Sequence, residues 1–68
     1  MTFQLTEHDH IPLNNLLKLL NLVETGGEAN IRITDREVKV NGEIETQKRK
    51  KLRPGDVVEF QRKKITIQ

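Results

Sequence analysis

Side chains able to carry covalent chemistry are scarce in this sequence of 68 residues. It contains no Ser, Cys, Tyr or Trp, so a nucleophile would have to be a Thr or a Lys, and no neighbouring group is placed to activate one. His8 and His10 could chelate a metal from one side of an extended segment, but a complete site needs three or four ligands. We therefore expect no catalytic residue, no metal site and no cofactor, and we interpret both histidines as loop residues.

Positive charge, in contrast, is concentrated in one stretch, "TQKRKKLRPGDVVEF" at residues 46–60. Its cations are Lys48, Arg49, Lys50, Lys51 and Arg53. Residues 1–35 hold two cations and five anions, whereas residues 36–68 hold ten cations and five anions. Such asymmetry indicates a polyanionic partner, although Lys-rich hairpins also keep small proteins soluble.

Two further places could contact an anion. Thr25, Gly26 and Gly27 open a predicted helix, where free N–H groups and the positive end of the helix dipole favour phosphate. The alternative there is a tight turn between helices. Lys39 lies on a predicted hairpin just before the basic stretch, and its alternative is a cross-strand pair with Glu43.

If the polyanionic partner is a nucleic acid, the aromatic content of the chain restricts which kind it can be. The only aromatic residues are Phe3 and Phe60, and both fit the predicted core. Modules that grip single strands stack bases on exposed rings. Contacts would therefore go to phosphates, 2′-hydroxyls and shape, which suits folded or double-helical RNA.

Two helices are predicted to position these groups. The first, within residues 11–22, has the apolar spacing i, i+3, i+4, i+7 of an amphipathic helix, formed by Leu13, Leu16, Leu17 and Leu20. Pro12 fits its first position, and Asn21 is the expected stop. In the second helix, Thr25 and Glu28 have the spacing of a capping box, in which each side chain reaches the other's backbone N–H. Ala29 and Ile33 would face the core.

Strands are predicted before and after the two helices. Phe3 and Leu5 share one face of a short first strand. The Asn-Gly pair at 41–42 predicts a hairpin. A two-residue loop would pair Lys39 with Ile44. We prefer a three-residue loop, which pairs Val38 with Ile44 and so keeps apolar residues together.

A second hairpin is predicted around Arg62 and Lys63, after a turn at Pro54. Its inward-facing residues are Val58, Phe60, Ile65 and Ile67. The expected fold is α+β, with two N-terminal helices packed on a small, mainly antiparallel sheet. Residues 1–68 would form one domain, without linkers or repeats.

The remaining composition indicates a location. The first ten residues lack the basic and apolar regions of a signal peptide, and "LLKLLNLV" is too short and too polar to span a bilayer. The absence of Cys suits a reducing compartment. We expect a soluble cytoplasmic domain with no membrane partner, and a monomer by default.

The order of these motifs resembles a known family. The resemblance is carried by "LNNLLKLLNLVETGGEANIRITDREVKVNGEIET" followed by "KLRPGDVVEF", roughly residues 11–60. It is a resemblance to the RNA-binding domain named after ribosomal small-subunit protein S-four (the αL RNA-binding motif). More closely, the chain resembles the small stand-alone bacterial proteins of the YbcJ type. The most specific piece is "VKVNG" at 38–42, placed after a helix with Ala29 and before Gly55 and Asp56.

This chain departs from the family pattern at four places, one of which is Asn21, where the first helix of the family closes with Gly. Asn14 stands where the family has Asp. The second helix of the family usually opens with Ser-Arg, against Thr25 and Gly26 here, so the capping hydroxyl is kept and an arginine contact is lost. Arg36 occupies a position where the family tends to have Gly, so a positive φ there would strain it.

The resemblance implies a non-catalytic module that binds structured RNA, such as ribosomal or transfer RNA. The contacts that it implies here are Thr25, Gly27, Lys39, Lys48, Arg49, Lys50 and Lys51, with Arg32 and Arg53 at the rim. One alternative is a protein-interaction module whose basic hairpin docks an acidic partner. Another is a regulatory domain derived from a larger RNA-modifying enzyme.

Overall fold

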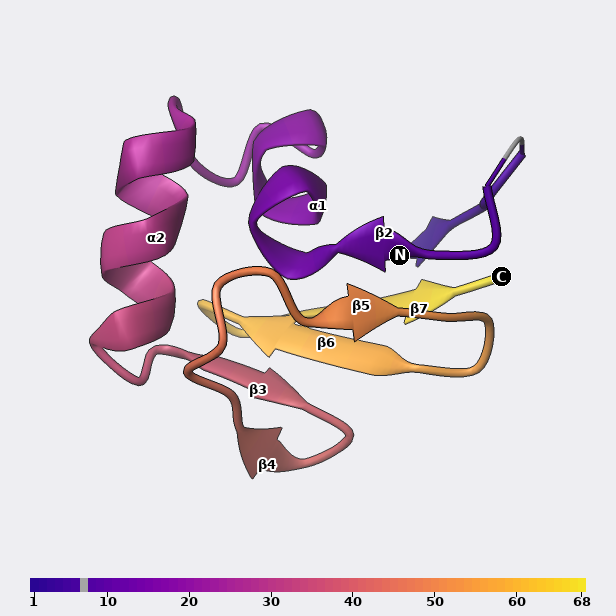
Figure 1. Ribbon diagram of the computed structural model, residues 1–68. Helices are drawn as coiled ribbons and strands as arrows, with labels where there is room; N and C mark the ends of the chain where they lie inside the picture. The colour runs from indigo at the N-terminus through magenta and orange to yellow at the C-terminus, as the bar shows by residue number, and fades with distance from the viewer. Residues whose placement is uncertain (7) are drawn as a thin grey trace.

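The computed structural model describes residues 1–6 and 8–68, so Glu7, in the predicted loop before the first helix, lies outside them. Two helices cover one face of a five-stranded sheet, and a two-stranded ladder lies beside them (Figure 1). The elements, in chain order, are β1 (Thr2–Phe3), β2 (Ile11–Pro12), α1 (Leu13–Leu19), α2 (Gly26–Thr34), β3 (Val38–Val40), β4 (Glu43–Ile44), β5 (Lys51–Leu52), β6 (Val57–Phe60) and β7 (Lys63–Ile67). The predicted α+β class is confirmed.

The strand order in the main sheet is β1-β7-β6-β3-β4. Every neighbouring pair is antiparallel except β1 and β7, which run parallel. The sheet is therefore mainly antiparallel, as predicted. Strand β2 pairs with β5 in the separate ladder, which the sequence did not predict.

Helix α1 buries the predicted leucine stripe. Leu13, Leu16 and Leu17 are fully buried, while Leu20 packs partly buried against the core. Pro12 is the N-cap residue rather than the first helical residue, so the helix begins one residue later than predicted. Asn21 ends the helix with a φ of 57° and donates its N–H to Lys18, the geometry of a left-handed C-terminal cap.

Helix α2 begins with the predicted cap. The Glu28 N–H donates to Thr25 Oγ1 at 3.0 Å. The Glu28 carboxylate accepts from the Glu24 N–H at 2.9 Å rather than from Thr25, so the reciprocal bond of the capping box is displaced by one residue. Ala29 and Ile33 are fully buried, as expected.

The register of the first hairpin differs from the prediction. Lys39 pairs with Ile44 and Val40 pairs with Glu43 across a two-residue turn. Asn41 and Gly42 both have positive φ values, 54° and 84°, as a type I′ turn requires. The three-residue loop was wrong because the apolar partner of β3 is β6. Ile44 therefore lies on an edge strand, 46% exposed.

The second hairpin turns one residue earlier than predicted. Phe60 pairs with Lys63, so Gln61 and Arg62 form the turn, with φ values of 49° and 66°. All four residues predicted to face inward are buried: Val58, Phe60, Ile65 and Ile67. Together with the leucines of α1, they form the core between the sheet and the helices.

Arg36 follows α2 in the left-handed region, with a φ of 67°. Its N–H donates to Ile33 O, and the next N–H, of Glu37, donates to Arg32 O. This bond pair is the Schellman motif, whose left-handed position usually holds Gly or Asn. The backbone conformation therefore explains the glycine of the resembling family, and Arg36 is strained.

Replacing this arginine should stabilise the protein. We expect Arg36→Asn to raise the free energy of unfolding by roughly 0.5–1 kcal/mol, because Asn tolerates the left-handed conformation. Urea denaturation measures the change. The control is Arg36→Gln, which removes the same charge and leaves the strain in place. An equal gain in both variants would assign the effect to charge.

Candidate nucleic-acid interface

The basic run, residues 48–51, is attached to the beginning of α1 by main-chain atoms. The Leu13 N–H donates to Lys50 O at 2.9 Å, and the Asn14 N–H donates to Lys48 O at 3.0 Å. The first N–H groups of a helix have no partner inside the helix, and α1 has no side-chain cap. Carbonyl groups of the basic run therefore cap this helix.

The run is also fixed at each end. After it, Leu52 is fully buried and pairs with Ile11 in the β2–β5 ladder. Before it, the Lys50 N–H donates to Gln47 O at 3.2 Å, which closes a turn. The backbone is thereby held toward the protein, and the side chains extend outward.

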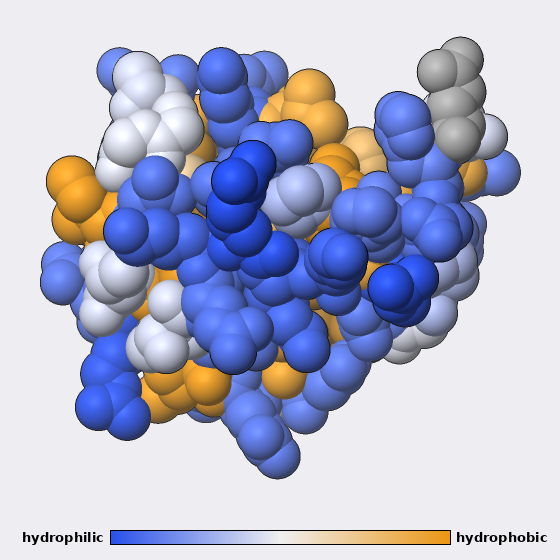
Figure 2. Space-filling model, viewed as in Figure 1, coloured by the Kyte–Doolittle hydropathy of each residue, from blue (hydrophilic) through white to orange (hydrophobic). Residues whose placement is uncertain are grey.

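The side chains of the basic run are available to a ligand. Lys48, Arg49 and Lys51 are exposed, and Lys50 is half-buried. Among residues 1–6 and 8–68, none of the four forms an ion pair with a carboxylate. Figure 2 shows hydrophilic residues gathered over this part of the surface. The run thus presents four adjacent cations that form no ion pair with a described carboxylate, although Asp56 lies near enough to Lys50 for their charges to interact.

Arg53, a predicted rim residue, is paired. Its guanidinium lies 3.6 Å from an oxygen of Asp9. The other oxygen of Asp9 is 2.8 Å from His10 Nδ1. That hydrogen bond is the main cause of the lowered pKa of Asp9, with a smaller contribution from Arg53.

Arg32, the other predicted rim residue, is paired twice. It lies 3.3 Å from Glu37 and 3.6 Å from Glu28. The hydrogen bond to Glu37 is the main cause of the raised pKa of Arg32. Both rim arginines would have to leave carboxylates in order to bind an anion.

The beginning of α2 lies away from the basic run. The two helices are antiparallel neighbours (Figure 1), so Thr25 and Gly27 lie at the other end of α1, on the order of 10 Å from its N-terminus at 1.5 Å per residue. Gly27 is exposed, and beyond its own helix and chain neighbours a Cβ there would meet Thr25 Oγ1, at 3.8 Å. However, the Glu28 carboxylate occupies the same end of the helix, which reduces its attraction for phosphate.

Lys39 is also separate from the basic run. It lies on the face of the sheet opposite the helices, between Glu59 of β6 and Ile44 of β4. The sequence had grouped Lys39 with the run because the two are close in the chain. Conversely, residues 62–64 were interpreted only as part of a hairpin, although Arg62 and Lys64 are exposed cations.

A side-chain clamp holds the two turns beside the interface. Asp56 accepts hydrogen bonds from the Arg53 N–H at 2.9 Å and from Asn41 Nδ2 at 3.1 Å. The Val57 N–H donates to Asn41 Oδ1 at 2.9 Å. The bond from Arg53, followed by that from Asn41, lowers the pKa of Asp56.

This clamp should make stability depend on acid pH. Because the pKa of Asp56 is lower in the folded state, its contribution is complete above the unfolded pKa of about 3.9. It is lost as the pH falls through the folded value. Because the clamp is exposed and water screens its charge, we expect a loss of no more than about 1 kcal/mol, measured as urea unfolding free energies from neutral to strongly acid pH. In Asp56→Asn this part of the pH dependence should be absent; an unchanged profile would contradict the assignment.

The described residues contain neither a candidate metal site nor a helix that could span a membrane. Among them, no group of three or more His, Cys, Asp or Glu side chains is placed to hold a metal ion. None of the helices in the described part of the chain has the length and hydropathy needed to cross a bilayer.

The fold and the anchored basic run together define a small binding domain of the helix-pair-and-sheet type. Residues 3–68 match the S4 domain family, and the chain belongs to this family. The solution structure of YbcJ from Escherichia coli superposes with a TM-score of 0.72 and 41% identity, over 97% of this chain and 84% of YbcJ. That structure is described as revealing an αL motif involved in RNA binding.

Two curated relatives are similar in sequence. One is "Putative RNA-binding protein YbcJ" of Escherichia coli strain K12, which is 46% identical over 59 residues, or 87% of this chain and 84% of that protein. The other is "Probable ribosome maturation protein RlbA" of Bacillus subtilis strain 168, which is 39% identical over 51 residues, or 75% of this chain and 72% of that protein. The resemblance inferred from the motifs is confirmed.

Proposed function

We propose that this chain is a non-catalytic cytoplasmic module that binds structured RNA through its phosphates, as a single domain over residues 1–68 and as a monomer. The observation that carries the proposal is the basic run. Four adjacent cations are held outward by main-chain bonds to α1, and no described carboxylate pairs with them. Phosphate contacts of Lys and Arg supply most sequence-independent affinity for nucleic acid.

The family supports RNA as the polyanion, since the S4 domain relative YbcJ is described as having a motif involved in RNA binding. The name of the Bacillus subtilis relative refers to ribosome maturation. This favours ribosomal RNA over transfer RNA, and it supports the cytoplasm, where bacterial ribosomes mature.

The predicted contacts differ in strength under this proposal. The principal contacts are Lys48, Arg49, Lys50 and Lys51. Arg32 and Arg53 would contribute less, because binding costs each its carboxylate partner. Thr25 and Gly27 would offer hydrogen-bond donors to RNA that extends along the helix pair.

Crosslinking in cells tests the function. A tagged copy of the full chain would be crosslinked to RNA by ultraviolet light, purified under denaturing conditions, and the attached RNA sequenced. We expect ribosomal RNA to be enriched over an untagged control. Enrichment of transfer RNA would change the proposed ligand. A specific protein partner that survives nuclease treatment, without enriched RNA, would instead favour the acidic-partner alternative.

A further inference from the structure

A second group of cations lies on the outer face of the sheet, opposite the helices. Lys39, Glu59 and Lys64 form one row across β3, β6 and β7, so a single carboxylate lies between two ammonium groups. Arg36 and Arg62 flank this row from the turns after α2 and β6. We call Arg36, Lys39, Arg62 and Lys64 the sheet-face cluster.

Few described carboxylates neutralise this cluster. All four members are exposed, and within the described ranges none forms an ion pair. Glu37, which also borders the face, is engaged by Arg32 at 3.3 Å. Among the described residues of the row, Glu59 is therefore the one carboxylate, and it lies beside a cluster of four cations.

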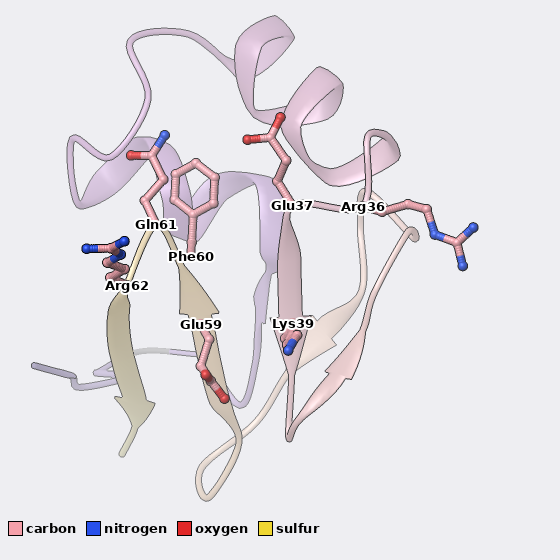
Figure 3. Close-up of a pocket in the computed structure, with 7 residues that line it drawn as sticks. All are labelled: Arg36, Glu37, Lys39, Glu59, Phe60, Gln61 and Arg62. Carbon is pink, nitrogen blue, oxygen red and sulfur yellow. The ribbon is translucent and has the colours of Figure 1, made fainter.

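The shape of the face suits an extended polyanion. Arg36, Lys39 and Arg62 border a shallow hollow of about 220 Å³. Figure 3 shows that the guanidinium groups of Arg36 and Arg62 point to opposite sides, with Lys39 between them. With strands about 4.8 Å apart, the row alone spans roughly 10 Å. Charges this widely spread match successive phosphates of a nucleic-acid strand better than one small anion.

The turns that present the arginines are strained. Arg36, Gln61 and Arg62 all border the hollow, and all have positive φ values, 67°, 49° and 66°. A two-residue hairpin turn of this type prefers Asn-Gly, and the cap after α2 prefers Gly. Strained residues of this kind cluster at functional sites. Arginine at two such positions keeps charge where another residue would fold better.

We propose that the sheet-face cluster binds the phosphate backbone of a second RNA segment, so that one copy of the protein holds two segments together. This inference rests on the proposed function of the basic run. The run is bonded to α1 on the helix-covered side of the sheet, whereas Lys39 and Lys64 lie on the other side. The molecule measures 28 × 23 × 19 Å, so RNA on one side leaves the other side accessible.

A bridging assay tests the proposal with a defined probe. A biotinylated RNA hairpin is immobilised, the full chain is added, and a fluorescent copy of the same hairpin is then supplied in solution. The unsubstituted protein should retain the fluorescent hairpin. Arg36→Asn/Arg62→Asn should itself remain bound to the immobilised hairpin through the basic run, but retain at least tenfold less fluorescent hairpin. Both changes place Asn at left-handed positions, so folding is preserved.

The matched control is Lys18→Glu, which changes the net charge by the same two units at an exposed position on α1. It should bridge as well as the unsubstituted protein. Equal loss in this control would overturn the proposal, because net charge would be the cause. Bridging that survives in Arg36→Asn/Arg62→Asn would also overturn it, because two copies of the basic run would then join the hairpins.

Two remaining outcomes separate the proposals. If the unsubstituted protein does not bind the immobilised hairpin, the proposed function fails, and this inference fails with it. If it binds but never retains the second hairpin, only the inference fails. Capture of poly-glutamate that Arg36→Asn/Arg62→Asn abolishes would then assign the face to an acidic protein.

Discussion

Replacing Lys48, Arg49, Lys50 and Lys51 together by Gln should lower affinity for structured RNA on the order of 10³-fold near 0.1 M salt, since each neutralised phosphate contributes a slope of about −0.9 in log K against log salt. The slope itself should become smaller by roughly three to four units. Fluorescence anisotropy with a labelled ribosomal RNA fragment, repeated at several salt concentrations, measures both quantities.

The variant should remain folded, because only main-chain atoms of the basic run bond to α1. Its circular dichroism and thermal midpoint should match those of the unsubstituted protein. Gln4→Glu/Lys18→Glu/Gln68→Glu lowers the net charge by the same four units at exposed positions outside both groups of cations, and should leave most of the slope intact. If the quadruple variant keeps its full salt slope, the basic run does not contact RNA.

Leu52→Ala should destabilise the protein by about 2–5 kcal/mol, the usual range for truncating a buried leucine. Leu52 is fully buried, and it ends the segment that carries the basic run. The whole stability of a small domain is on the order of 5–15 kcal/mol, so this single truncation would remove a large share of it. Urea denaturation followed by circular dichroism gives the change.

The neighbouring variant Lys51→Ala separates burial from strand pairing. Lys51 is the adjacent residue of β5 and pairs with Pro12 in the β2–β5 ladder, but its side chain is exposed. Its replacement should change stability by no more than about 0.5 kcal/mol. If Leu52→Ala lowered the free energy of unfolding by as little as this, β5 would not be anchored through the core.

Local patterns predicted the helices well. The spacing of Leu13, Leu16 and Leu17 identified the buried side of α1, because three or four residues return a helix to the same face. Thr25 identified the start of α2, because its hydroxyl can satisfy an N–H group only three residues away. Such interactions are contained in a few neighbouring residues, so the sequence displays them.

Long-range pairing was harder to predict. The Asn41-Gly42 turn favoured the correct register, but we gave more weight to pairing Val38 with Ile44. That choice failed because Val38 finds its partner in Phe60, twenty-two positions away. The β2–β5 ladder was missed because two residues per strand leave no alternation to recognise.

The charges of the interface were readable only in part. Consecutive cations made the basic run visible in the sequence. The pairing of Arg53 with Asp9 joins residues far apart in the chain, and no local sequence pattern predicted it. The sheet-face cluster was hidden for the same reason: Arg36, Lys39, Arg62 and Lys64 come from separate segments that meet only in the folded sheet.

The main-chain attachment of residues 48–50 to α1 has an evolutionary consequence. Every amino acid offers the carbonyl group that Leu13 and Asn14 require, so substitutions here can alter ligand preference with little penalty to folding. Closely related chains should therefore tolerate diverse side chains at these positions while keeping the loop length and the buried leucine after it. Such a segment lets recognition diversify on a constant scaffold.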